Sequence, residues 1–232
     1  MNHIELIAVD LDGPLLTDSF APLLKQSCDF YGLDYTRDME NNMLSRNRRD
    51  ATAYFMASFG ENLPDDIMGK SHEELTASYF EFRKNFLAEN PISLSEGAAD
   101  LLALLPDLGV RLICYGGLDE DYMRCELGAH ADVFERYVST NDFRPGVKEI
   151  VHDIAGVSAD RALFIDDVNF VAEHAREQGC CFIGVPARND WGWQRLEMQE
   201  AGVPFILDHA GIITRKLLDQ IDEQAGRGSF WK

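Results

Sequence analysis

The chain has 232 residues, of which 46% are hydrophobic and 26% are charged, and its formal net charge at pH 7 is -19. This composition is typical of a globular protein that buries a substantial core. The excess of negative charge excludes nucleic acid and anionic membrane surfaces as partners, because both require a basic face. We expect neither a signal peptide nor a membrane helix, which needs about 20 apolar residues. The five cysteines contain no C-x-x-C spacing, which favours reduced thiols and a cytoplasmic protein.

The first predicted element is a buried strand over residues 4–9, and it ends in Asp10-Leu11-Asp12-Gly13. Side chains alternate along a strand, so Asp10 and Asp12 are expected on one side with Leu11 on the other. Two carboxylates at a buried strand end repel each other unless a charge offsets them, and a hard divalent cation does so with oxygen ligands. The alternative is an ordinary strand-end turn, where Asp and Gly are common.

Residues 15–93 contain helical patterns and no convincing strand, and Pro14 and Pro91 bracket them. One such pattern is formed by Leu75, Tyr79, Phe82 and Phe86. The segment therefore reads as a helical insertion placed directly behind Asp12. We expect it at the carboxyl edge of a sheet, which is where open α/β sheets bind ligands.

From residue 94 onward, short apolar strands alternate with amphipathic helices, which is the pattern of a parallel sheet wrapped by helices. The expected elements are a helix over 97–108, strands over 110–115 and 137–139, a helix over 146–155, a strand over 162–165, a helix from 168, a strand over 180–185, an extended segment over 204–207, and a helix from 210 to 221. The predicted fold class is α/β, with a Rossmann-like core formed by 1–14 and 94–232 and a helical domain formed by 15–93.

A second acidic strand end follows at Leu163-Phe164-Ile165-Asp166-Asp167. If its strand lies near the first one, Asp10, Asp167 and a backbone carbonyl near Asp12 form an oxygen cage that suits Mg²⁺. The alternative is that Asp167 only caps the helix that begins there. Two matching acidic ends on two strands favour the metal site.

These motifs resemble those of the haloacid dehalogenase superfamily of hydrolases, in the subgroup with a helical cap that includes phosphoglycolate phosphatase and β-phosphoglucomutase. Asp10-Leu11-Asp12-Gly13 matches the D-x-D-G signature, residues 112–117 match the second strand, and residues 164–167 match the terminal acidic motif. Residues 95–97 resemble the loop by which the chain re-enters the core. The resemblance covers about 1–14 and 94–225.

The resemblance implies a magnesium-dependent phosphatase acting on a small phosphorylated metabolite. Asp10 corresponds to the nucleophile that forms an aspartyl-phosphate, and Asp12 to the general acid and base. Asp10, Asp12, Asp166 and Asp167 correspond to the residues that hold Mg²⁺. An aspartate at position 12 argues against the dehalogenase branch, whose pattern lacks an acid/base group there.

Three positions depart from the family pattern. Gly116 stands where the family usually has Ser or Thr, and with Gly117 it is expected to offer backbone N–H groups to the phosphate; a turn chosen for conformation alone is the alternative. Arg144 stands where the family has a phosphate-binding Lys, with Lys148 as the second candidate. Pro14 removes a backbone N–H close to Asp10.

Two alternatives stay open: a phosphomutase of the same fold, and, because of Gly116 and Arg144, a catalytically degenerate binding or regulatory protein. The basic cluster Arg46-Asn47-Arg48-Arg49 is either a contact for a distal anionic group of the substrate or a solvated face. Trp191 and Trp193 are expected either to line the pocket or a partner surface, or to cover the core. Residues 226–232 are predicted to be a frayed tail. The oligomeric state is left open.

Overall fold

A computed structural model describes residues 1–60, 63 and 65–232. Its centre is a parallel sheet in the order β3-β2-β1-β4-β5, which confirms the predicted fold class. The strands are β1 (Leu6–Asp10), β2 (Arg111–Gly116), β3 (Arg136–Ser139), β4 (Ala162–Asp166) and β5 (Cys181–Gly184). Every residue of β1 and β4 is buried, which explains why both segments are continuous apolar runs rather than alternating ones.

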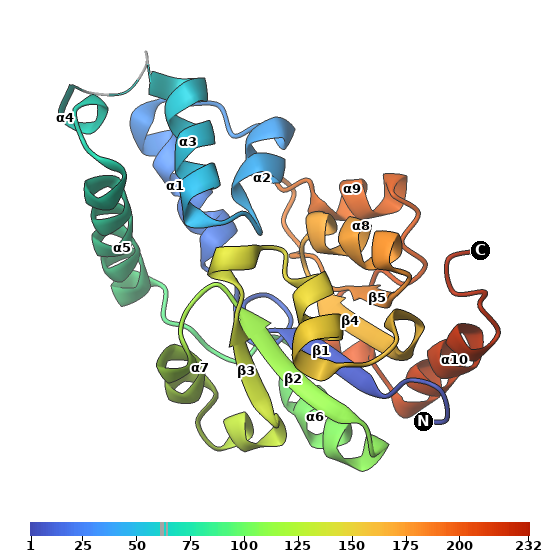
Figure 1. The fold of residues 1–232 in the computed structure, drawn as a ribbon. Coiled ribbons are helices and arrows are strands. Elements are labelled where there is room, and N and C mark those ends of the chain that lie inside the picture. The colour runs from blue at the N-terminus through green and yellow to red at the C-terminus, as the bar shows by residue number, and fades with distance from the viewer. Residues whose placement is uncertain (61–62, 64) are drawn as a thin grey trace.

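Helices cover both faces of the sheet (Figure 1). Ile7 and Val9 of β1 point to the face that packs against α6 (Ala98–Leu104), α7 (Glu120–Leu127) and α10 (Arg215–Gly226). Leu6 and Ala8 point to the opposite face, beside a π-helical segment (Glu149–Ala155), α8 (Asn169–Gln178) and α9 (Gln194–Glu200). The period-two alternation of a strand thus places neighbouring residues in two separate cores.

The segment 15–93 forms helices that gather at the carboxyl edge of the sheet, away from both chain termini (Figure 1). They are α1 (Phe20–Tyr31), α2 (Arg37–Met43), α3 (Arg48–Phe59), α4 (Asp65–Met68) and α5 (His72–Glu89). Local signals begin several of them, because Thr36, Asn47 and Ser71 accept backbone N–H groups as N-caps. At α5 the Ser71 and Glu74 side chains complete a reciprocal capping box.

The two connections between this segment and the sheet lie side by side. Leu16 and Leu94 form an antiparallel bridge, and the N–H of Thr17 donates to the carbonyl of Ser93 at 2.9 Å. The Ser95 hydroxyl donates to the Gly13 carbonyl at 2.8 Å, which ties the re-entry loop to the D-x-D-G turn. The helical segment is therefore anchored directly behind Asp12.

Helix α2 also contacts the core, through α9 and the loop before it. Arg37 pairs with Glu197 and Glu200, and the buried Glu40 accepts hydrogen bonds from the Trp193 N–H at 2.9 Å and from the Gln194 amide at 2.8 Å. Trp191 meets Tyr35 edge to face, with ring centroids 5.3 Å apart. The Trp191 ring and the backbone N–H of Trp193 thus join the helical segment to the rest of the chain.

Two expected helices differ from the structure in their bounds. The helix predicted over 97–108 ends at Leu104 and continues as a 3-10 turn over Leu105–Leu108, and the last helix starts at Arg215 instead of 210. The extended segment over 204–207 lies beside β5, where Ile206 forms a single parallel bridge with Gly184.

The C-terminal tail is packed rather than frayed. Phe230 is 6% exposed, and the Trp231 indole donates to the Cys180 carbonyl at 2.8 Å. Two large aromatic side chains that reach an apolar surface gain enough buried area to hold a short tail in place. Among the helices that the structure describes, none combines the length and apolar character needed to cross a bilayer.

Candidate active site

The two acidic strand ends meet at one place because β1 and β4 are neighbours. Val9 is paired with Ile165, so the residues that follow them leave the sheet together. The Asp167 carboxylate packs over Gly13: a Cβ on Gly13 would lie only 2.6 Å from its Oδ2 atom. Gly13 also has φ of +108°, a conformation that only glycine adopts easily. Glycine at this position therefore allows the second acidic end to approach the first.

Asp10 is buried, and its Oδ1 atom has no hydrogen-bond partner among the described residues. Burial, and next the charge of Asp166, raise the pKa of Asp10 well above its usual range, while Arg144 acts in the opposite direction. A buried carboxylate oxygen without a partner is unstable unless a cation or a ligand contacts it. The structure thus presents one oxygen of Asp10 to a group from outside the protein.

Asp166 is held by hydrogen bonds to both of its oxygens. The Tyr115 hydroxyl donates to Oδ2 at 2.5 Å and the Val168 N–H donates to Oδ1 at 2.8 Å. Burial raises the pKa of Asp166 to about 6, and these two hydrogen bonds limit the rise. Asp167 is also buried, and burial together with the charges of Asp166, Asp18 and Asp10 raises its pKa well above the usual range.

Asp12 follows the end of β1, and its charge contributes to the raised pKa of Asp10. Its Oδ1 accepts a hydrogen bond from the Tyr122 hydroxyl at 3.1 Å. Burial raises the pKa of Asp12 to about 6, with a further contribution from Asp18, while Arg83 and the Tyr122 hydrogen bond lower it. A carboxyl group with a pKa near neutrality is suited to giving and taking protons.

Asp18, Tyr122 and Arg83 belong to this site, and the sequence reasoning did not identify them. Asp18 accepts the N–H groups of Phe20 at 2.7 Å and Ala21 at 3.2 Å, and so begins α1. Its position before a helix is a capping signal that could have indicated it. Arg83 and Tyr122 come from α5 and α7, and their sequence contexts show only helical periodicity.

The glycine pair and Arg144 are fitted to each other. The space that a Cβ on Gly117 would occupy is filled by the Arg144 guanidinium, and a Cβ on Gly116 would lie 2.8 Å from the Tyr137 hydroxyl. The Gly116 carbonyl accepts the Thr140 hydroxyl at 3.0 Å, which fixes the turn. The position of Arg144, itself a departure from the family pattern, thus requires a residue without a side chain at Gly117.

Arg144 is the cation whose field reaches Asp10 and Asp166. Its Nη1 atom lies 3.5 Å from the Ser45 hydroxyl of the helical segment. Lys148, the second candidate, is exposed to solvent. Of the two basic residues, the structure therefore brings Arg144 to the acidic site.

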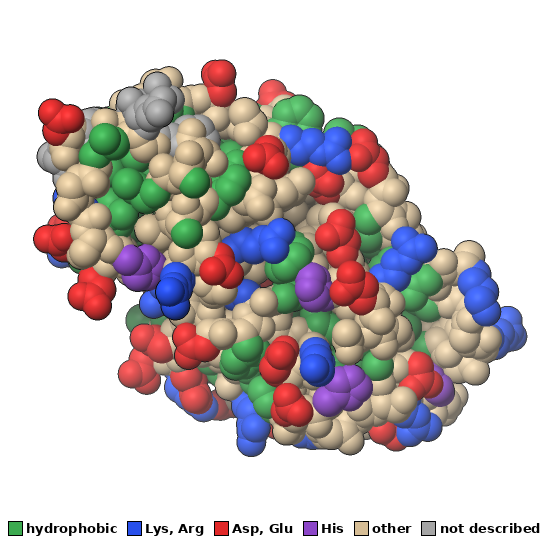
Figure 2. Space-filling view, turned by 45° about the horizontal axis from the view of Figure 1, so that its top comes forward, with side chains coloured by type: hydrophobic (Ala, Val, Ile, Leu, Met, Phe, Trp, Pro, Cys, Tyr) green, Lys and Arg blue, Asp and Glu red, His purple; other side chains and the backbone are tan. Residues whose placement is uncertain are grey.

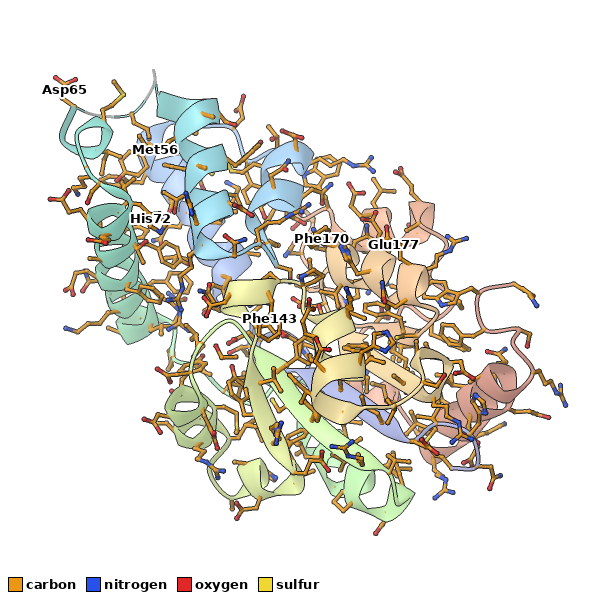
Figure 3. The ribbon with its side chains drawn as sticks, in the orientation of Figure 1. Met56, Asp65, His72, Phe143, Phe170 and Glu177 are labelled. Atoms are coloured by element: carbon orange, nitrogen blue, oxygen red, sulfur yellow. The ribbon has the colours of Figure 1, made fainter. Side chains whose placement is uncertain are left out.

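The basic cluster 46–49 divides between two locations. Arg46 stacks on Phe170 of α8, with its guanidinium carbon 3.4 Å from the ring centroid, so it joins the helical segment to the core. Arg48 donates to the Gly117 carbonyl at 3.1 Å. Arg48 and Arg49 also line an open pocket of about 840 Å³ together with His72 at the start of α5. Phe170 and His72 are labelled in Figure 3.

On the face shown in Figure 2, basic and acidic side chains are interspersed, with no uniformly basic patch.

The acidic site has the donor chemistry that Mg²⁺ requires. It offers hard carboxylate oxygens, one of them the unpartnered Asp10 Oδ1. In the described part of the chain, no three Asp, Glu, His or Cys side chains by themselves enclose a metal position. Mg²⁺ commonly binds through one or two carboxylates and completes its shell with water and substrate phosphate, so this set fits it. Asp10 and Asp167 are the best candidates, because both Asp166 oxygens already accept hydrogen bonds.

No protein-family model and no curated protein matches the sequence. Solved structures match almost the whole chain, which confirms the resemblance at the level of the fold. β-Phosphoglucomutase from Clostridium difficile is 13% identical, with a TM-score of 0.70 and coverage of 95% of this chain and 98% of that one. CbbY from Rhodobacter sphaeroides, solved with phosphate, is 20% identical, with a TM-score of 0.64 and coverage of 93% and 99%. A haloacid dehalogenase-like protein from Agrobacterium tumefaciens is 16% identical, with a TM-score of 0.67 and coverage of 94% and 99%.

Proposed function

We propose that this chain is a magnesium-dependent phosphatase that hydrolyses a small phosphomonoester through an aspartyl-phosphate on Asp10. The observation that carries the proposal is the buried Asp10 carboxylate, whose Oδ1 lacks a partner and whose pKa, raised by burial, is lowered in part by the nearby charge of Arg144. A nucleophile needs a free lone pair, and a phosphate dianion needs positive charge nearby. Both are present at one strand end.

Each neighbouring residue then has a chemical role. Asp10 attacks phosphorus, and the bond to the leaving oxygen breaks as Asp12 donates its proton to that oxygen. Asp12 next takes a proton from the water that hydrolyses the aspartyl-phosphate. Arg144 and the backbone of Gly116 and Gly117 hold the transferring phosphoryl group.

Asp10 and Asp167, with Asp12 and Asp166 beside them, are the residues that would hold Mg²⁺. When bound, the ion supplies positive charge that offsets the repulsion between phosphate and carboxylates. The raised pKa values of Asp10 and Asp167 support this assignment, because a bound cation relieves the repulsion that raises them.

The substrate class follows from the helical segment and from the neighbours. Residues 15–93 act as a cap over the core formed by 1–14 and 94–232, so the substrate is a small metabolite rather than a polymer. CbbY from Rhodobacter sphaeroides has been solved with phosphate and, as a mutant, with xylulose-(1,5)bisphosphate. A sugar phosphate or a comparably small phosphorylated acid is the expected substrate here.

Two alternatives keep the same site. The polar contacts between α2 and α9 hold the cap against the core and would exclude water, which favours a phosphomutase. Gly116 has no hydroxyl to bind the phosphoryl group, and the Tyr137 hydroxyl lies 2.8 Å from where a Cβ at this position would be. This feature favours a binding protein without turnover.

A phosphate-release screen separates these functions. The wild-type chain, with Mg²⁺ or with EDTA, is incubated with a panel of small phosphomonoesters, and Asp10→Asn and Asp132→Asn are tested beside it. Asp132 is the matched control, because its side chain is 85% exposed. Release that requires Mg²⁺ and Asp10 but not Asp132 supports the phosphatase; isomerisation without release supports the mutase. Ligand binding without any turnover contradicts both.

A further inference from the structure

A chain of hydrogen bonds connects the cap helix α5 to Asp12. The Nη2 atom of Arg83 lies 3.0 Å from the Ser19 hydroxyl and 3.1 Å from the Tyr122 hydroxyl. The Tyr122 hydroxyl in turn lies 3.1 Å from Asp12 Oδ1. Arg83 is the buried residue of α5 and is 7% exposed. A residue of the helical segment thus reaches, through one tyrosine, the carboxyl group assigned to proton transfer.

The chemistry of the three groups sets the direction of these hydrogen bonds. A guanidinium group only donates, so the Tyr122 oxygen accepts from Arg83. The single hydroxyl proton of Tyr122 is then directed to Asp12 Oδ1. Because Oδ1 is already an acceptor, a proton carried by Asp12 resides on Oδ2. The hydrogen bonds therefore make the two carboxyl oxygens of Asp12 different: Oδ1 accepts from Tyr122, and Oδ2 carries the proton.

Arg83 packs against two aromatic rings and forms no direct ion pair with a described residue. Its guanidinium lies over the Phe20 ring at 5.0 Å and over the Tyr122 ring at 5.2 Å. Among the described residues no carboxylate is within ion-pair distance of it, and its Nε has no hydrogen-bond partner. Burying an arginine in this way costs free energy. A contribution to stability alone therefore does not explain its position.

We infer that Tyr122 and Arg83 are positioning residues for the proton transfer by Asp12, which rests on the proposed phosphatase function. Tyr122 orients the carboxyl so that the Oδ2 proton passes to the leaving oxygen while the Asp10–phosphorus bond forms and the old ester bond breaks. Arg83, a residue of the helical segment, holds Tyr122 in place through its hydrogen bond to the hydroxyl.

The test exploits the fact that a good leaving group does not need a proton. We measure kcat/KM, which reports phosphoryl transfer to Asp10, for phenyl, nitrophenyl and dinitrophenyl phosphate with Mg²⁺. Tyr122→Phe is expected to lower the value for phenyl phosphate by about tenfold or more and to change that for dinitrophenyl phosphate little. Arg83→Met is expected to act in the same direction. Tyr54→Phe is the matched control, since it removes a hydroxyl of the helical segment that donates to Asp38 and not to Asp12.

A second comparison isolates the route through Asp12. In an Asp12→Asn background, Tyr122→Phe is expected to have no further effect on phenyl phosphate, because the acid that it orients is gone. The inference would be overturned if Tyr122→Phe lowered kcat/KM equally for all three esters. It would also be overturned if the losses in kcat/KM were additive in the Asp12→Asn, Tyr122→Phe double variant. In both cases the Asp10-dependent activity, and with it the proposed function, would stand. If the wild-type chain hydrolyses none of the three esters nor any of the screened metabolites, the proposed function and the inference fail together.

Discussion

Replacing Asp12 with Asn is expected to make the metal-free protein more stable at neutral pH. Burial raises the pKa of Asp12 to about 6, whereas the ordinary carboxyl titrates at 3.8. The folded state therefore keeps a proton that the unfolded state loses, and stability falls as the pH rises between these two values. Above this range both states are ionised and the folded state carries the full penalty. A difference of about two pKa units corresponds to about 3 kcal/mol.

Asn keeps the shape of the side chain and an oxygen that accepts the Tyr122 hydroxyl, so the substitution removes mainly the charge. We expect Asp12→Asn to raise the free energy of unfolding by about 3 kcal/mol near pH 8, with no gain below about pH 4. Urea unfolding in EDTA, followed by tryptophan fluorescence, measures this difference against wild type and Asp132→Asn. An Asp12→Asn chain no more stable than wild type near pH 8, or a gain that persists unchanged in acid, would refute the assigned burial penalty.

Three further outcomes are expected. Saturating Mg²⁺ should stabilise the wild-type chain by about 2–3 kcal/mol at one hundred times its Kd, and Asp167→Asn should lose most of that gain in a thermal shift measurement. Gly117→Ala should displace the Arg144 guanidinium and raise the KM for a phosphomonoester by about tenfold, with a smaller effect on the free energy of unfolding. Glu40→Ala should lower the free energy of unfolding by about 3 kcal/mol in urea, because it leaves buried donors of the α2 contact without an acceptor; an unchanged midpoint would contradict the role of that contact.

Features encoded by neighbouring residues were predicted from the sequence, whereas features that depend on contacts between distant residues were not. The strands, their acidic ends and the α/β order were predictable, because each is encoded in a few consecutive residues. The meeting of Asp10 with Asp167 was predictable in principle, since parallel strands end at one edge of a sheet. The tail was predicted wrongly, because its position depends on a surface formed by residues far away in the chain.

The pattern of apolar runs and aspartates was sufficient to specify a parallel sheet, its carboxyl edge and a cluster of carboxylates there. Tertiary packing alone decided how those carboxylates are held: Tyr122 reaches Asp12 across 110 positions, and Arg83 reaches Tyr122 across 39. Packing likewise decided that Arg144 fills the space beside Gly117 and that Arg46 stacks on the core. The physical reason is that periodicity and turn chemistry act over a few residues, whereas burial, hydrogen-bond partners and pKa values depend on what the folded chain brings together.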